Sequence, residues 1–288
     1  MNDFPVTAVV SEGETLRVEA LPFGVKRLVL NRPEVRNAFD ETMIGELSLT
    51  LEALAAVADP MEMRLLLIEG KGKVFSAGAD LGYMKRLGEQ SFEKSIEDAR
   101  GLARLFYRLA DFPVPVVAYV QGAAIGGGLG LTVCADYVVA EERALFATSE
   151  VRLGIVPGVI SPFIIRKVGL HASSTMMLSG ARLSAWEAAE VGLVQSVAEG
   201  SERSARLQEA VVSFLEAGPL ATRRTKRLIK RIQPLPDPDM IEFTARQIAE
   251  ARGEEEARQG LSAFFTKKVP PWAEEVARVQ GGGKKKAP

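Results

Sequence analysis

The sequence predicts an α/β fold in which a largely parallel sheet is followed by helices. Apolar, β-rich runs alternate with helical patterns over the first two thirds of the chain. Glycine-rich turns follow two of these runs, and β patterns vanish from Ser201 onward. Strands that alternate with helices are typical of a parallel sheet covered by helices. We therefore expect one sheet-based core with a helical C-terminal part.

The elements expected from these patterns follow one another along the chain. The first are paired strands over residues 15–20 and 25–31 and a helix over 40–58, with Leu47, Leu51 and Leu54 on one face. Then come a strand over 64–69, a helix over 91–110, a strand over 114–120, a helix over 127–134 and a strand over 136–140. Four helices are expected in the C-terminal part, over 202–216, 220–232, 238–252 and 254–267. We divide the chain into an α/β core (1–200), a helical region (201–272) and a tail (273–288) whose Gly- and Lys-rich composition is typical of disorder.

Composition excludes several classes of protein. The 36 Lys and Arg residues nearly cancel the 37 Asp and Glu residues, so no overall field favours nucleic acid or an anionic membrane. A single cysteine, Cys134, rules out an internal disulfide and fits a reducing compartment. The sole histidine, His171, leaves no nitrogen and sulfur ligand set for a metal. No apolar run reaches the roughly 20 residues of a membrane helix, and Met1 to Pro5 lacks a leader pattern. We expect a cytoplasmic protein without a metal.

The most informative stretch is VPVVAYVQGAAIGGGLGLTVCAD, from Val114 to Asp136. A buried strand enters a triple glycine, Gly126 to Gly128, and a small-residue helix follows. Such a turn directs free backbone N–H groups of the helix start toward one point, which suits a phosphate or the oxyanion of a reacting carbonyl. The alternative interpretation is close helix packing, for which glycine is also suited.

A second stretch upstream has the same organisation. The strand-like MRLLLIE (63–69) leads through a glycine turn into VFSAGADL, from Val74 to Leu81. The small side chains from Ser76 to Ala79 carry no reactive group, so any chemistry must come from their backbone. Two such elements are able to supply the two donors of an oxyanion hole. The alternative interpretation is an ordinary turn in which Asp80 caps the next helix.

These blocks resemble the enoyl-CoA hydratase/isomerase (crotonase) superfamily. The resemblance lies in FSAGADL, VQGAAIGGGLGL with CAD after it, and SEVRLGIVPG, and extends to LNRPEVRNAFD, LSGARLSAWEAAEVGLVQSV and EARQGLSAFFTKKVPPW. It implies a crotonase spiral fold of ββα repeats with a C-terminal helical trimerisation region, and a homotrimer or homohexamer. NRPEVRNAFDETMI and VRLGIVPGVISPFI most resemble the methylglutaconyl-CoA and carboxygeranoyl-CoA hydratase group.

The resemblance also implies the catalytic residues. It assigns the oxyanion hole to the backbone N–H groups of Ala79 and Gly127, and the acid/base role to Glu150 of SEVRLG. Hydratases of this superfamily usually carry a first glutamate two positions after the glycine triplet, where this chain has Gly130. The alternative interpretation of Glu150 is a surface carboxylate or a helix cap, a role for which Ser149 beside it is also suited.

Coenzyme A, which the substrate itself carries, is the only cofactor-like group that the resemblance implies. It places the CoA moiety against two loops and the end of the last helix, at Arg36, Ala38, Ala77, Gly78, Asp80, Leu81 and Lys268. For Arg36 and Lys268, a solvated surface side chain is an equal alternative.

The function that we expect is an acyl-CoA hydratase, a lyase that adds water to an α,β-unsaturated thioester through a stabilised enolate. The resemblance relates it to fatty acid metabolism or leucine degradation. Because Gly130 replaces the usual glutamate, three alternatives stay open: an enoyl-CoA isomerase, an acyl-CoA decarboxylase and a catalytically weak acyl-CoA-binding homologue. A Clp-type serine peptidase is rejected, since His171 lies outside any matching block and no general base remains.

Overall fold

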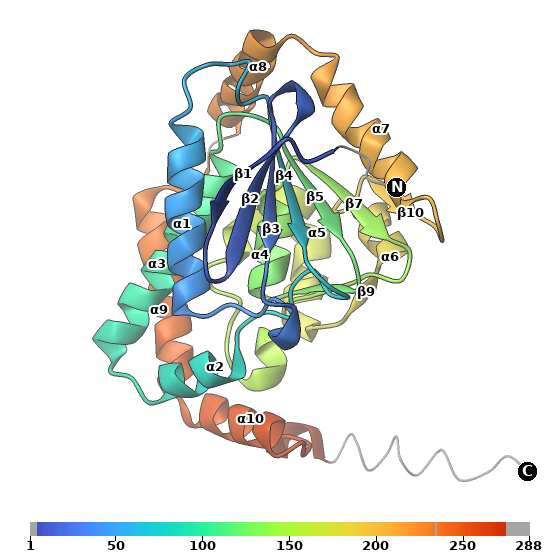
Figure 1. Cartoon of the computed structure of the whole chain (residues 1–288). Coiled ribbons are helices and arrows are strands. Elements are labelled where there is room, and N and C mark those ends of the chain that lie inside the picture. Colours follow the sequence, from blue (N-terminus) through green and yellow to red (C-terminus); the bar gives the residue numbers. More distant parts are fainter. Residues whose placement is uncertain (1–4, 234, 275–288) are drawn as a thin grey trace, which may run out of the picture.

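A computed structural model of the chain, which describes residues 5–233 and 235–274, contains two sheets surrounded by helices (Figure 1). The larger sheet has the order β1-β2-β3-β4-β5-β7-β10. Its strands are β1 (Ala8–Glu12), β2 (Leu16–Leu21), β3 (Val25–Leu30), β4 (Leu65–Gly70), β5 (Val116–Val120), β7 (Tyr137–Glu141) and β10 (Ser196–Ala198). The first three strands pair antiparallel and the later ones pair parallel. The smaller sheet has the order β6-β8-β9, from β6 (Ala123–Ile125), β8 (Leu145–Ala147) and β9 (Leu183–Ser184).

Helices cover both faces of the larger sheet because its central strands are apolar on both sides. In β4, Leu66 and Ile68 join the main core, whereas Leu65 and Leu67 join a second cluster on the opposite face. Successive side chains of a strand point to opposite faces, so a continuous apolar run is typical of a strand buried on both sides. The second cluster is closed by α7 (Arg203–Leu215).

The main core lies on the other face, against most of the remaining helices. The remaining helices are α1 (Glu41–Ala55), α2 (Leu81–Gly88), α3 (Phe92–Ala110), α4 (Gly127–Cys134), α5 (Ser161–Ser179), α6 (Ala185–Glu190), α8 (Pro219–Ile232), α9 (Pro238–Gly253) and α10 (Glu255–Phe265). Figure 1 shows α1 along one flank of the sheet and α10 below the rest of the molecule. Every strand and helix that the sequence predicts by residue range is present, with ends shifted by at most three residues.

The sequence patterns missed the short strands, because they exist only through pairing with distant segments. β6 has three residues and β9 has two, too few for an alternating pattern. All five residues of β1 are exposed, so no apolar face marks it. His171 lies inside α5, two residues after a break at Gly169.

The C-terminal helices pack directly against the α/β part. Arg100 of α3 pairs with Glu242 of α9 at 2.7 Å, and Arg252 pairs with Asp98 at 3.1 Å. Ala245 and Ile248 of α9 belong to the main core. The division of the chain at residue 200 therefore stays a prediction, made from the sequence pattern. Most of the predicted tail, residues 275–288, lies outside the described part of the chain.

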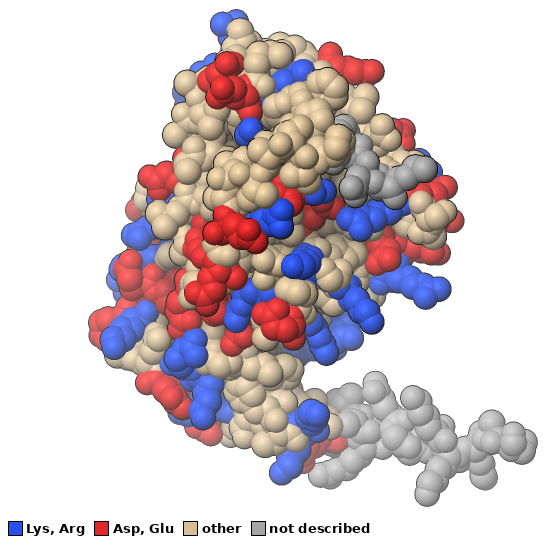
Figure 2. Space-filling view, viewed as in Figure 1, with Lys and Arg blue, Asp and Glu red and all other residues tan. Residues whose placement is uncertain are grey.

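The surface charge agrees with the sequence. Figure 2 shows basic and acidic side chains interspersed over the viewed face, without a field of one sign. Within the described residues, no helix combines the length and apolar character needed to cross a bilayer. The same residues hold no group of three or more His, Cys, Asp or Glu placed to bind a metal ion.

Candidate active site at the glycine-rich loops

Three segments meet at the carboxyl ends of β4 and β5. The backbone of Ala77 donates to Arg36 O at 3.0 Å, and Phe39 donates to Gly78 O at 2.7 Å. Ser76 bridges the loop after β4 to β6: its N–H donates to Ala123 O, and its carbonyl accepts from Ile125. The loop after β4 therefore lies between the 36–39 segment and the glycine-rich turn, and it holds both by backbone hydrogen bonds.

The backbone N–H of Ala79 is open to a ligand. Phe39 and Ala79 form a parallel bridge in which Phe39 makes both bonds, to Gly78 O and from Asp80 N. In such a bridge the paired residue points its own N–H and C=O the other way. Ala79 is exposed, and no described residue accepts from its N–H. This is the environment expected for an oxyanion donor.

Gly127 supplies the second open N–H. It is the first residue of α4, and the first intrahelical bond runs from Gly130 N to Gly126 O at 2.9 Å. The N-cap residue, Gly126, adopts φ 50° and has no side chain to cap the helix. No acceptor for the Gly127 N–H is present in the described part of the chain. The helix start thus presents free donors and the positive end of its dipole.

Glu150 faces the same point. It begins the 3-10 helix η3 (Glu150–Leu153), and a Cβ atom at Gly126 would lie 3.3 Å from its Oε1 and 3.8 Å from Gly78 Cα. Its other oxygen, Oε2, is buried without a hydrogen-bond partner, although the residue as a whole is partly exposed. Ser149 makes no capping bond with its side chain. Burial raises the pKa of the Glu150 carboxyl to about 7, against a weaker lowering by its own backbone N–H.

The position of the usual first glutamate is occupied by apolar side chains. Gly130 is buried in α4, and a Cβ atom there would lie 2.4 Å from Phe106 Cζ and 2.9 Å from Ile160 Cγ2. Phe106 itself packs edge-on against Phe163, with ring centroids 6.3 Å apart. A glutamate at 130 therefore requires Phe106 to move. The absence of this carboxylate is built into the packing around α4.

The residues expected to contact CoA divide into two groups. Arg36, Ala38, Ala77, Gly78 and Asp80 lie together, because backbone bonds join their two segments. Asp80 also caps α2, accepting from Gly82 N at 2.9 Å, which confirms the structural interpretation of this residue. Leu81 follows it and is exposed. Lys268 lies beyond the end of α10, and no recorded contact joins it to the other six among the described residues.

Sequence reasoning missed the residue that holds the loops together. Asn37 is fully buried with φ 53°, its Oδ1 accepts from Arg32 N at 2.9 Å, and its Nδ2 donates to Lys71 O and Val74 O. A buried amide with all these bonds satisfied fixes the two loops against each other. The available signal was its place in the RNAFD block, between two residues assigned to CoA.

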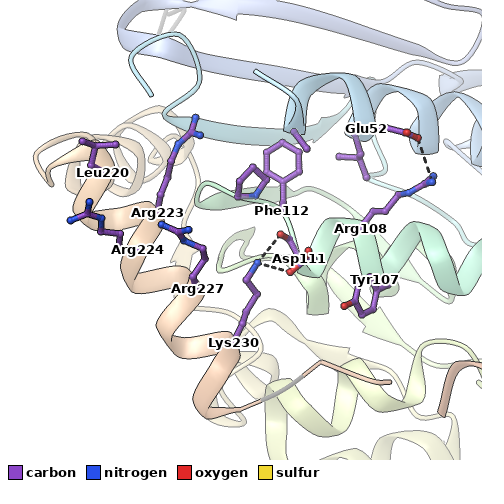
Figure 3. Close-up of a pocket in the computed structure, with 13 residues that line it drawn as sticks. Glu52, Tyr107, Arg108, Asp111, Phe112, Leu220, Arg223, Arg224, Arg227 and Lys230 are labelled. Atoms are coloured by element: carbon purple, nitrogen blue, oxygen red, sulfur yellow. Dashed lines mark hydrogen bonds and ion pairs between the residues drawn. The ribbon is translucent and has the colours of Figure 1, made fainter. Parts of the chain in front are cut away.

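One hollow of the surface lies away from these loops. It has a volume of about 720 Å³ and is lined by α1, the end of α3 and α8, at the opposite end of the sheet from the glycine-rich loops (Figure 3). Most of its cations are already engaged: Arg223 donates to Met63 O, Lys230 pairs with Asp111, and Arg108 pairs with Glu52. None of the predicted site residues lines it. The candidate active site is therefore the place where the open N–H groups and Glu150 lie together, and not this hollow.

Comparison with known proteins shows which family the chain belongs to. The family model described as enoyl-CoA hydratase/isomerase matches residues 22–275. A putative enoyl-CoA hydratase of Thermus thermophilus is 34% identical over 84% of this chain and 94% of its own length. The 2,3-dehydroadipyl-CoA hydratase of Escherichia coli is 32% identical over 84% and 92%.

Solved structures give the same result. An enoyl-CoA hydratase from Shewanella pealeana has a TM-score of 0.72 at 38% identity, covering 90% of this chain and 96% of the other. One from Mycobacterium avium has a TM-score of 0.76 at 28% identity, covering 91% and 100%. The predicted crotonase fold is thereby confirmed. Because the family model covers most of the chain and these relatives match it over more than four fifths of its length, this chain belongs to the enoyl-CoA hydratase/isomerase family.

Proposed function

We propose that this protein is an acyl-CoA hydratase in which Glu150 alone serves as acid and base. The observation that carries the proposal is the carboxyl of Glu150, which has a buried, unpartnered oxygen and lies beside the two glycine-rich loops. A buried carboxyl without a partner is costly to the fold unless a substrate or water uses it. The substrate is a 2-enoyl thioester of coenzyme A.

The residues support a balanced reaction. Glu150 takes a proton from water while the water oxygen bonds to Cβ, and the Cα=Cβ electrons shift to the thioester carbonyl as an enolate. The N–H groups of Ala79 and Gly127 hold the enolate oxygen. The enolate then re-forms the carbonyl as Cα takes a proton from Glu150. Since one group both accepts and donates, a pKa near neutrality is the most suitable.

A second reaction is favoured by the surroundings of Gly130. Phe106 and Ile160 occupy the place from which a second carboxylate would hold the attacking water. An isomerase that moves a proton between Cα and Cγ of an enoyl thioester needs one base and no bound water. Isomerisation by Glu150 on the same enolate is therefore the alternative function.

We propose the finer features from the resemblance and the relatives. The acyl group is of the methylglutaconyl type, the enzyme is a cytoplasmic homotrimer or homohexamer, and the CoA moiety lies over the Arg36 and Ala77 loops. The E. coli relative is by name a hydratase of a CoA ester, which supports hydration. A substrate panel that includes methylglutaconyl-CoA, together with light scattering, tests these features.

The decisive test compares Glu150→Gln with the wild type. Gln preserves the shape of the side chain but cannot exchange the proton, so turnover should fall by about 10²–10⁴-fold. Hydration of crotonyl-CoA is followed by loss of the conjugated thioester absorbance, and isomerisation of a 3-enoyl-CoA by its appearance. Affinity for a saturated acyl-CoA, measured by calorimetry, should stay within a few fold and serves as the control.

Two outcomes would overturn the proposal. Near-normal turnover in Glu150→Gln would remove Glu150 from the reaction and leave a decarboxylase, which needs chiefly the oxyanion hole, as the better interpretation. Failure of the wild type to bind any acyl-CoA at millimolar concentration would contradict the substrate class itself.

A further inference from the structure

The C-terminal helix α10 packs against η3, the segment that begins with Glu150, and glycine residues lie at the contact. A Cβ atom at Gly260 would lie 2.3 Å from Leu153 O, the last residue of η3, and 2.5 Å from Leu153 C. From the other side, a Cβ atom at Gly154 would lie 2.6 Å from Glu256 O of α10. Real Cβ atoms do not approach a backbone so closely. The two segments therefore lie backbone against backbone, and only glycine at these positions permits it.

The segment that carries Glu150 has little else to fix it on that side. None of its four residues is buried, and no side chain caps it. Its opposite side rests on the end of α5, where Arg152 donates to Ser179 O at 3.2 Å and a Cβ atom at Gly180 would lie 3.1 Å from Val151 Cγ2. η3 is thus held between α5 and α10. By fixing the backbone of η3, these two helices also fix the direction in which the Glu150 side chain points.

The face of α10 toward η3 is built from small residues. Ala257, Gly260 and Ala263 are buried, whereas Phe264 and Phe265 on other faces are substantially exposed. α10 also touches the end of α2, where a Cβ atom at Gly88 would lie 3.9 Å from Leu261 Cδ1. Because α2 starts directly after Ala79 and Asp80, α10 contacts both the element that carries the base and the element that follows an oxyanion donor.

We propose that Gly260 is a positioning residue for Glu150: the close contact of α10 with η3 sets the place of the catalytic carboxyl. This inference rests on the proposed role of Glu150. A displacement of about 1 Å in a catalytic group is enough to cost about 10²-fold in rate. Gly260 touches no substrate in this scheme and acts only through the backbone of Leu153.

The test substitutes Gly260→Ala, with Gly253→Ala as the matched control. Gly253 ends α9, close to α10 in sequence, and a Cβ atom there would meet nothing within 4 Å. Gly260→Ala should lower kcat for crotonyl-CoA hydration, or for 3-enoyl-CoA isomerisation, by about 10- to 100-fold with KM changed little. Its kcat–pH profile should also shift to lower pH, because a displaced carboxyl is less buried. Gly253→Ala should match the wild type in kcat and in pH profile.

A double variant distinguishes a positioning role of Gly260 from a purely structural role. If Gly260 acts through Glu150, adding Gly260→Ala to Glu150→Gln should lower the rate little beyond Glu150→Gln alone. Independent effects would multiply instead, and that outcome overturns the inference. So does wild-type kcat and pH profile in Gly260→Ala while Glu150→Gln remains inactive. If both Glu150→Gln and Gly260→Ala keep full activity, the result contradicts the proposed function instead.

A milder variant covers the case in which Gly260→Ala does not fold. A Cβ atom at Gly260 would lie 2.9 Å from Trp272 Cη2, and Trp272 is 42% exposed. Trp272→Ala removes this side chain, which lies beside Leu153 against Gly260, without opening the core. It should lower kcat in the same direction, by a smaller factor, and shift the pH profile likewise, with Trp272→Phe as the conservative control. Wild-type kcat and pH profile in Trp272→Ala would overturn the inference.

Discussion

The two ends of the larger sheet differ in how their polar groups are hydrogen-bonded. At the carboxyl ends of β4 and β5, the N–H groups of Ala79 and Gly127 and the Oε2 of Glu150 have no partner among the described residues. At the other end, where α8 docks, Lys226 donates to Val114 O at 2.8 Å and to Asp136 Oδ2, and Asp136 also accepts from Val116 N.

We interpret this difference as one between a candidate active site and a region that stabilises the fold. Buried polar groups are normally satisfied, so those left open mark a place where a ligand completes them. The α8 end has a hollow and more cations, and its buried ammonium group, Lys226, is bound to the chain itself, although Nε of Arg223 is buried there without a hydrogen-bond partner. A buried carboxyl oxygen without a partner, lying beside two open N–H groups, is therefore a better guide to the candidate active site than the volume of a hollow.

The strongest way to break the comparison is to remove a polar group at the α8 end. Lys226→Met leaves Asp136 without its cation, and since the Asp136 side chain is 35% exposed we expect a loss of about 1–3 kcal/mol in the free energy of unfolding. Urea unfolding measures it, and kcat should not change. Arg227→Met on the same helix is the control, because Arg227 has no recorded partner in the described structure. A fall in kcat at unchanged stability would show that the α8 end takes part in catalysis and would contradict the comparison.

The pH dependence sharpens the comparison at the glycine-rich end. With a pKa of about 7, Glu150 is a base only in its deprotonated form, so kcat/KM should rise with pH through about 7. Between the ordinary carboxyl pKa of 4.5 and about 7, the folded state keeps a proton that the unfolded state releases. Stability should therefore fall as pH rises through this window.

Glu150→Gln isolates this contribution to stability. Relative to the wild type, the variant should gain thermal stability at pH 8 and little at pH 4, by about 2–4 °C in Tm for each kcal/mol. Calorimetry over this pH range gives the measurement. A constant difference in Tm between the two proteins at every pH would show that Glu150 titrates normally.

The smallest expected effect concerns the exposed cations of the hollow. Arg224 and Arg227 line it, and no ion pair is recorded for either within the described chain (Figure 3). Arg224→Ala with Arg227→Ala should change stability by less than about 0.5 kcal/mol and leave the KM for crotonyl-CoA unaltered. A several-fold rise in KM would mean that the hollow takes part in binding the CoA ester.

The sequence by itself determined the fold class, most of the long strands and helices, and the blocks on which the proposed chemistry depends; the long helix α5 was not among the predicted elements. The apolar run of β4 and the periodic leucines of α1 record burial directly, because hydrophobic spacing reflects the faces that an element buries. The glycine triplet at 126–128 likewise indicated a helix start without a cap. Fold resemblance then assigned roles to Ala79, Gly127 and Glu150.

Only the tertiary structure decided how these groups are placed and supported. That Oε2 of Glu150 is unpartnered, that Phe106 fills the space beside Gly130, and that Gly260 lies against Leu153 all depend on contacts between segments far apart in the chain. Local patterns carry propensity and burial, but the electrostatic environment of a carboxyl and the room beside a glycine are set by neighbours from other elements. The same reason explains why β6 and β9 escaped prediction: such short strands are defined only by the strands with which they pair.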